Sequence, residues 1–170
     1  MTIETIREMH KEKISGGYIS LLRVTLGLSF FTTWLSNISK GVFTDPDEYK
    51  GTINYFIDHA DHISTPVDTF IREVIYEDSL IWFFIIGWFI VEGFIGLSLI
   101  FGFFNRFGSA MGAFFTVFLF LGALGVDWEW TYILLIVGFI TCGWSRAGRW
   151  YGVDYWLQEK IPPKLAKILI

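Results

Sequence analysis

Four stretches of the chain are almost free of charged residues, and more polar segments separate them. They cover residues 16–38, 79–104, 107–126 and 128–145. The second stretch has 26 residues. As a helix rising about 1.5 Å per residue, it exceeds the roughly 30 Å thickness of bilayer hydrocarbon. We therefore predict a transmembrane helix over each of these four ranges.

The connections between these stretches indicate how the helices are arranged. Asn105–Arg106 and Asp127–Glu129 leave room only for tight turns, so consecutive helices should be antiparallel neighbours. Gly108 and Gly112 form a G-x-x-x-G pattern, which favours close helix packing in lipid. The predicted fold is an all-α integral membrane protein: a four-transmembrane-helix antiparallel bundle that forms one membrane domain over residues 1–170.

Residues 40–78 form the one long connection, and their pattern predicts a structured amphipathic outer loop between the first two helices. Apolar residues recur with a helical period from Tyr49 to Ile63. Thr65 and Pro66 then suit the N-cap and the first position of another helix. We expect two short amphipathic helices on the outer surface of the bundle or the bilayer.

The lysines and arginines outside the apolar stretches are distributed unevenly between the two sides of the predicted bundle. One side has nine of them: Arg7, Lys11, Lys13, Arg106, Arg146, Arg149, Lys160, Lys164 and Lys167. The other side has three, Lys40, Lys50 and Arg72. This asymmetry predicts a multi-pass protein of the plasma membrane with both termini in the cytoplasm. It also explains the basic residues without nucleic acid as a partner.

Glu92 and Arg23 are the ionisable residues deep within the predicted spans. An unpaired carboxylate at this depth costs several kcal/mol, so it must be protonated or paired. Counted from the cytoplasmic ends, the two residues differ by roughly 9 Å in depth, which two long side chains can just bridge. Glu92 is either a proton-accepting group at a quinone site or a polar pin that fixes helix register. Arg23 either supports the same site or extends toward the cytoplasmic headgroups.

Other candidate groups give no redox centre. His59 and His62 in "DHADH" (Asp58–His62) form either part of a metal site or a solvated helix face. The histidines all lie outside the predicted spans, which disfavours haem, and Cys142 is a lone cysteine that suits helix packing. Trp128 and Trp130 either anchor the interface or border a ligand pocket. With no metal or haem predicted, any electron transfer needs a bound quinone or a partner protein.

Several short motifs occur in an order typical of one family. The first span contains "RVTLG" (Arg23–Gly27) and continues as "WLSNISKG" (Trp34–Gly41). Glu92 is followed by Gly96, Gly102 and Arg106, and "RAGRWYGVDYWL" (Arg146–Leu157) follows the last span. From about residue 19 to 157 the chain resembles the DoxX/DoxD family of four-span membrane proteins, most closely the archaeal DoxD type. Thr33 stands where many members have a histidine, and Val153 replaces a leucine.

The resemblance implies the small membrane subunit of a thiosulfate:quinone oxidoreductase, working with a DoxA-like partner in a hetero-oligomer within a respiratory membrane. Glu92 and Arg23 would be its catalytic residues, and Trp88, Trp34 and Arg106 would contact the quinone. The alternative is a non-catalytic accessory or assembly subunit of a terminal oxidase or another large membrane complex. Its G-x-x-x-G pattern would then pack against partner helices. A small transporter is a third reading, although the chain lacks an inverted repeat.

Overall fold

All regular secondary structure in the described part of the chain is helical. The computed structural model describes residues 3–59, 69–77, 79–124 and 128–170. The elements are α1 (Ile3–Ser39), α2 (Pro46–His59), the π-helical turn η1 (Ile71–Ile75), α4 (Ile81–Phe101), α5 (Asn105–Gly122), α6 (Glu129–Trp144), the 3-10 turn η2 (Ala147–Arg149), α7 (Asp154–Leu157) and α8 (Pro163–Leu169). The predicted all-α class is therefore confirmed.

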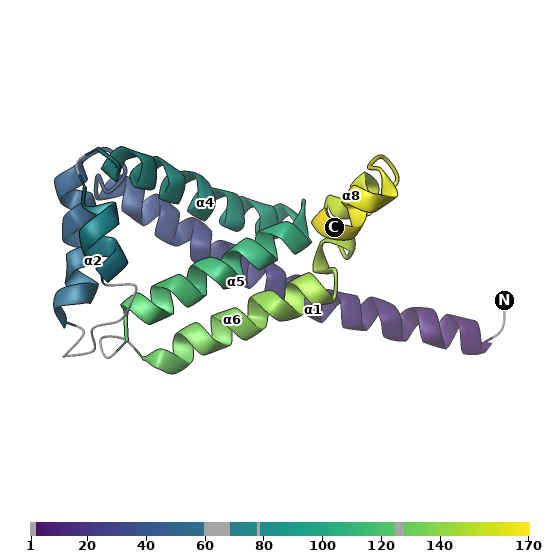
Figure 1. Cartoon of the computed structure of the whole chain (residues 1–170). Helices are drawn as coiled ribbons and strands as arrows, with labels where there is room; N and C mark the ends of the chain where they lie inside the picture. The colour runs from purple at the N-terminus through teal and green to yellow at the C-terminus, as the bar shows by residue number, and fades with distance from the viewer. Residues whose placement is uncertain (1–2, 60–68, 78, 125–127) are drawn as a thin grey trace.

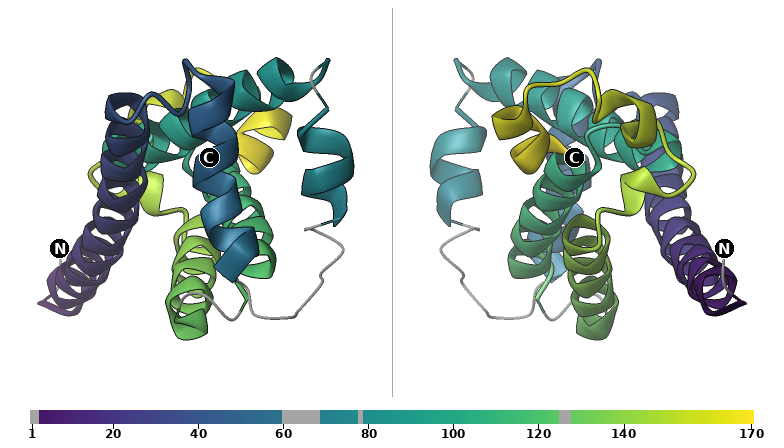
Figure 2. Two further views of the ribbon diagram at one scale, coloured as in Figure 1. Left: turned by 90° about the vertical axis from the view of Figure 1, so that its left-hand side faces the viewer. Right: turned by 90° about the vertical axis from the view of Figure 1, so that its right-hand side faces the viewer.

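The four long helices form the body of the molecule. α1 packs along α4, and α5 packs along α6 (Figure 1). The N-terminus and the C-terminal α8 lie toward one end of this body, whereas α2 lies at the opposite end, where α4 and α6 diverge. The side views show α2 standing beside the long helices at that end (Figure 2).

Two segments of the described chain are long and apolar enough to cross a membrane: Gly16–Ser39 of α1 and the whole of α4. α6 is apolar but has only 16 residues. α5 has 18 residues and begins with the polar pair Asn105 and Arg106. α5 starts two residues before the predicted span 107–126 and ends at Gly122, and α6 is one residue shorter than the predicted span 128–145 at each end.

α1 is much longer than the predicted span 16–38. It begins at Ile3 and runs without a break for 37 residues, and its N-terminal part projects beyond the other long helices (Figure 1). Residues 3–15 contain no glycine or proline and include several glutamates, lysines and other strong helix formers. The hydrophobic pattern located the membrane segment, but it did not reveal that the polar residues before it continue the same helix.

Glycines set the distances between the long helices. A Cβ atom on Gly27 would lie 2.7 Å from the backbone nitrogen of Ile100, and one on Gly96 would lie 2.9 Å from that of Phe31. Any side chain at these positions would push α1 and α4 apart. Gly108 and Gly112 are also buried inside the chain, where they face Ser98 of α4 and Phe139 of α6 respectively. The G-x-x-x-G pattern therefore packs within the bundle, and the expectation that it packs against partner helices is wrong.

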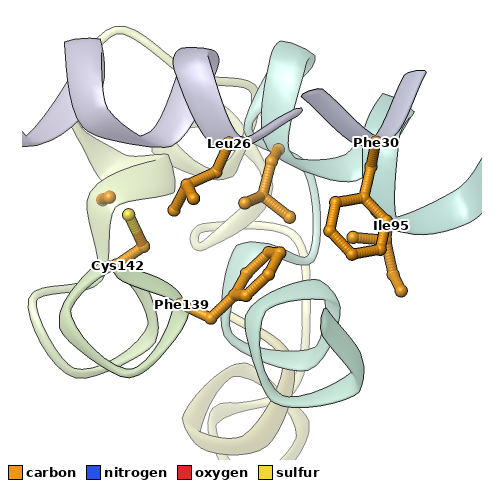
Figure 3. Close-up of a cluster of buried hydrophobic side chains, with 7 residues drawn as sticks. Leu26, Phe30, Ile95, Phe139 and Cys142 are labelled. Atoms are coloured by element: carbon orange, nitrogen blue, oxygen red, sulfur yellow. The ribbon is translucent and has the colours of Figure 1, made fainter. Parts of the chain in front are cut away.

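A hydrophobic core joins α1, α4 and α6 (Figure 3). Leu26 and Phe30 of α1 point toward Phe139 and Cys142 of α6, with Ile95 of α4 beside them. The rings of Phe30 and Phe139 meet edge to face, with centroids 5.2 Å apart. Cys142 is fully buried in this cluster, so it serves as a small packing residue, as the sequence indicated.

Candidate functional site

A large cavity of about 890 Å³ lies where α2, α4 and α5 approach the end of α1. Its walls are mainly aromatic and aliphatic, with Phe83, Phe84, Phe114, Phe115 and Phe118 among the lining residues. The polar groups on its wall include Thr33, Asn37, Lys40, Tyr49, Thr52 and Glu92. A mostly apolar pocket of this size with a few polar groups is typical of a site for a small organic ligand.

Glu92 supplies the buried acid of this cavity, with only 3% of its surface exposed. Its Oε2 atom accepts a hydrogen bond from Asn37 Nδ2 at 3.0 Å and another from Trp88 Nε1 at 3.2 Å. Its Oε1 atom accepts no hydrogen bond from any residue that the structure describes. One carboxyl oxygen is therefore held in place by two donors, while the other remains free for a ligand or water.

Helical spacing places the partners of Glu92. Trp88 precedes Glu92 by one turn of α4, so the two side chains share a helix face. On α1, Thr33, Asn37 and Lys40 occur at intervals of four and three residues, which also puts them on one face. All three line the large cavity. The acid from α4 and the amide from α1 meet because these two faces pack together.

Aromatic rings hold Trp88 at the cavity wall. Its ring meets Phe115 of α5 at a centroid distance of 5.5 Å and Tyr49 of α2 at 5.7 Å, both nearly perpendicular. Tyr49 is only 1% exposed, and its burial, with a smaller contribution from Tyr76, raises the pKa of its hydroxyl well above its usual range. Helix α2 thus covers the cavity with a neutral tyrosine.

Arg23 lies at the opposite end of the bundle and does not reach Glu92. It precedes Asn37 by 14 residues on α1, which corresponds to about 21 Å along the helix. Its Nη2 atom donates a hydrogen bond to the Tyr151 carbonyl at 3.4 Å, and only 1% of its surface is exposed. The expected depth difference of roughly 9 Å was too small. The C-terminal segment also covers Arg23, so the side chain does not extend to the headgroups.

Asp154 completes the structure around Arg23. Its two carboxylate oxygens accept hydrogen bonds from the backbone N–H groups of Phe104 and Asn105, at 2.7 and 2.9 Å. These donors begin α5, so the carboxylate caps that helix from 49 residues away along the chain. Burial raises the pKa of Asp154 above its usual range, although these two N–H groups and the positive charge of Arg23 oppose that shift. We call Arg23 and residues 151–154 the clasp.

Glycines make room for the clasp. Gly102 ends α4 with a φ of 68°, a conformation that favours glycine. The position that its Cβ would take is already filled by the Arg23 guanidinium. A Cβ on Gly152 would also lie only 2.7 Å from Arg23 Nη1. Arg23, Gly102 and Gly152, which belong to the motifs that resemble the family, therefore pack tightly against one another.

The candidate site residues form two groups: those at the large cavity and those in the clasp or at other helix contacts. Both groups lie within the part of the chain that matches a known family. A protein-family model described as "TQO small subunit DoxD" matches residues 18–170. The chain belongs to the DoxD family. This confirms the resemblance found in the sequence, and with the two membrane-length helices it makes the chain a membrane protein. No curated protein and no solved structure matches the chain at a significant level.

Of the five residues that the sequence suggested, this DoxD chain brings only Glu92 and Trp88 together at the large cavity. Trp34 lies outside its wall and donates its indole N–H to the Phe89 carbonyl at 3.0 Å, while packing against Gly93. Arg106, at the start of α5, donates to the Lys167 carbonyl of α8. The structure thus places Trp34, Arg106 and Arg23 in helix packing and chain-end contacts.

The sequence suggested two other candidate regions. Trp128 and Trp130 are exposed and line neither of the cavities described in this article. Most of the Asp58–His62 stretch lies outside the described residues, as does the start of the helix expected at Thr65. Within the described ranges no group of three or more histidine, cysteine, aspartate or glutamate side chains could hold a metal ion.

Asn37 and Tyr49 are the site residues of the DoxD chain that sequence reasoning missed. Asn37 had a visible signal, because Thr33, Asn37 and Lys40 are polar and their spacing puts them on one face of the helix. Tyr49 had no such signal, since only tertiary packing brings α2 against Trp88.

Proposed function

We propose that this chain is the four-span membrane subunit of a quinone-linked oxidoreductase, and that its large cavity receives the quinone head group. The observation that carries the proposal is the position of Glu92, a buried acid with one free carboxyl oxygen on the wall of an aromatic cavity of about 890 Å³. The DoxD family description, the small subunit of TQO, agrees with this assignment.

The surface supports four membrane spans. Large apolar side chains that line neither cavity are exposed on each long helix, for example Leu21 of α1, Ile90 of α4, Phe107 of α5 and Leu134 of α6, which are between 42% and 66% exposed. Lipid is the solvent that such a surface fits. The uneven distribution of lysine and arginine then favours an orientation with both termini in the cytoplasm, and we place the chain in the plasma membrane.

The residues around the large cavity fit a quinone. Phenylalanine rings suit its flat ring and its apolar tail, and the free Oε1 of Glu92 is suited to hydrogen-bond a quinone oxygen. A bound quinone supplies the electron-accepting chemistry for which the sequence indicates no other group. Glu92 would deliver a proton to that oxygen, and Asn37 and Trp88 would hold the carboxyl in position.

A partner must supply the electrons. We propose a hetero-oligomer with a DoxA-like subunit that oxidises thiosulfate, with terminal oxidase subunits as the alternative partners. The connection from Lys40 to Ser79 carries nine acidic residues against three basic ones, so on its own it would repel the thiosulfate dianion. The substrate would therefore bind mainly to the partner or to the three basic residues of that connection.

Glu92→Gln in the purified chain tests the site. Quenching of tryptophan fluorescence by a short-chain quinone would measure binding, and we expect it to weaken about fivefold, the loss of one hydrogen bond of about 1 kcal/mol from the protonated carboxyl to the quinone oxygen. Glu129→Gln is the matched control, because Glu129 is exposed and lines neither cavity. Thiosulfate-dependent quinone reduction by the intact complex should fall by at least as much.

Unchanged binding and unchanged turnover in Glu92→Gln would contradict the proposal. They would favour the accessory or assembly role, in which Glu92 is a polar pin between α1 and α4. Turnover by a complex that lacks this chain would favour the same alternative.

A further inference from the structure

A second, smaller cavity reaches Glu92 from the side of α6. It has a volume of about 130 Å³ and lies between α1, α5 and α6. Ser29, Thr33, Thr116 and Tyr132 carry hydroxyl groups on its wall, together with the Glu92 carboxyl and three apolar side chains. Thr33, Glu92 and Tyr132 also line the large cavity. Glu92 therefore belongs to the partition between two spaces of different character.

The small cavity has the size and the polar groups that water requires. Its volume is several times the roughly 10–15 Å³ that one water molecule needs. The hydroxyls of Ser29, Thr33 and Thr116 each donate to a carbonyl one turn earlier in their own helix, at 3.0, 3.0 and 2.7 Å. A hydroxyl that donates in this way still has lone pairs that accept hydrogen bonds from water.

The α1 helix extends this polar character outward. Thr25, Ser29, Thr32 and Thr33 are all exposed hydroxyl residues on this helix. The hydroxyl groups of this row are better solvated by water than by hydrocarbon. Thr116, by contrast, is fully buried at the inner wall of the small cavity. The hydroxyls thus lead from the surface of α1 to the Glu92 carboxyl.

We propose that the small cavity holds a cluster of water molecules through which Glu92 exchanges its proton, separately from the large cavity. A proton that leaves Oε1 toward a ligand is replaced by one from this water, and no electron moves in that exchange. This proposal rests on the proposed function in one respect only, namely that a bound quinone is what takes up the proton from Glu92. The exchange itself requires no quinone and can be measured without one.

Infrared spectroscopy of the purified chain on transfer from H₂O to D₂O would test this proposal. The carboxyl band of Glu92 is identified as the one that Glu92→Gln removes. We expect Thr116→Val, which keeps the side-chain shape but removes the hydroxyl, to slow the shift of this band at least about fivefold, the factor for one hydrogen bond of about 1 kcal/mol. Ser29→Ala, at an exposed position, is a second variant that poses little risk to folding.

Thr141→Val is the matched control. Thr141 makes the same hydrogen bond to its own helix, to the Val137 carbonyl at 2.8 Å, but it is exposed and lines neither cavity. Exchange at the wild-type rate in Thr116→Val and Ser29→Ala, or the absence of any exchanging Glu92 band, would overturn the proposal. Normal exchange in a chain that fails to bind quinone would instead overturn the proposed function and leave the hydrated cavity in place.

Discussion

Glu92 and Arg23 are both almost completely buried, yet their surroundings differ. Glu92 is held by two side chains and borders two cavities. Arg23 borders neither cavity, and the glycines beside it leave no room for a side chain. The difference shows that burial of an ionisable group within a membrane helix does not by itself indicate a site. The space beside the group decides whether it can meet a ligand or only hold helices together.

Asp154→Ala tests the Arg23 side of this comparison, and it should have the largest effect, a loss of stability. The change removes two hydrogen bonds to the start of α5 and leaves the Arg23 charge without its acidic neighbour. We expect the free energy of unfolding to fall by about 3–5 kcal/mol, as measured by thermal unfolding in detergent. Glu159→Ala, at an exposed position close by, is the control. A chain as stable as the wild type would mean that the clasp does not hold the bundle together.

Gly102→Ala should have an intermediate effect. The new methyl group would require a strained positive φ and would displace the Arg23 guanidinium. We expect a loss of about 2 kcal/mol or more in unfolding free energy. Gly17→Ala on α1, where no atom lies within 4 Å of the new Cβ, should be neutral or stabilising by up to about 1 kcal/mol. Equal effects of the two changes would argue against close packing at Arg23.

Trp88→Phe should have the smallest effect, and it should act on binding. The change removes the N–H donor to Glu92 but keeps an aromatic ring at the cavity wall. We expect quinone affinity to fall about fivefold, in line with the loss of about 1 kcal/mol. Because fluorescence quenching would lose one reporter, equilibrium dialysis is the better measurement.

Trp34→Phe is the matched change for this last test. It removes an indole N–H that donates to a backbone carbonyl outside the cavity. Quinone affinity should therefore stay the same, even if stability declines. A similar loss of affinity in both variants would show that ring size at the α1–α4 contact, rather than the hydrogen bond to Glu92, controls the site.

The sequence predicted the parts of this molecule that depend on local pattern. The helical class and the apolar segments of α1 and α4 follow from hydropathy, and the shared helix face of Trp88 and Glu92 follows from their one-turn spacing. The relation between Glu92 and Arg23 did not follow. Their depths were counted from assumed span ends, whereas α1 and α4 in fact pack with Asn37, not Arg23, beside Glu92.

Contacts between distant parts of the chain were the other features that the sequence could not supply. In the sequence, Asp154 was visible only as part of a C-terminal motif. Nothing in its local sequence indicates that its carboxylate caps the start of α5. The same holds for Tyr49, which reaches Trp88 from a different helix. Such contacts depend on how whole helices pack, and that packing is encoded by glycines and small residues spread over the entire chain.

The clasp has a consequence for how the protein is made. Arg23 and the carbonyl that receives its hydrogen bond are 128 residues apart, so translation delivers the guanidinium long before its partner. The first helix must enter the membrane with that charge uncovered, and the bundle can close only when residues 151–154 leave the ribosome. Closure of the clasp therefore requires a chain that has been synthesised through its last long helix, and a chain that ended earlier would leave the Arg23 guanidinium without the Tyr151 carbonyl.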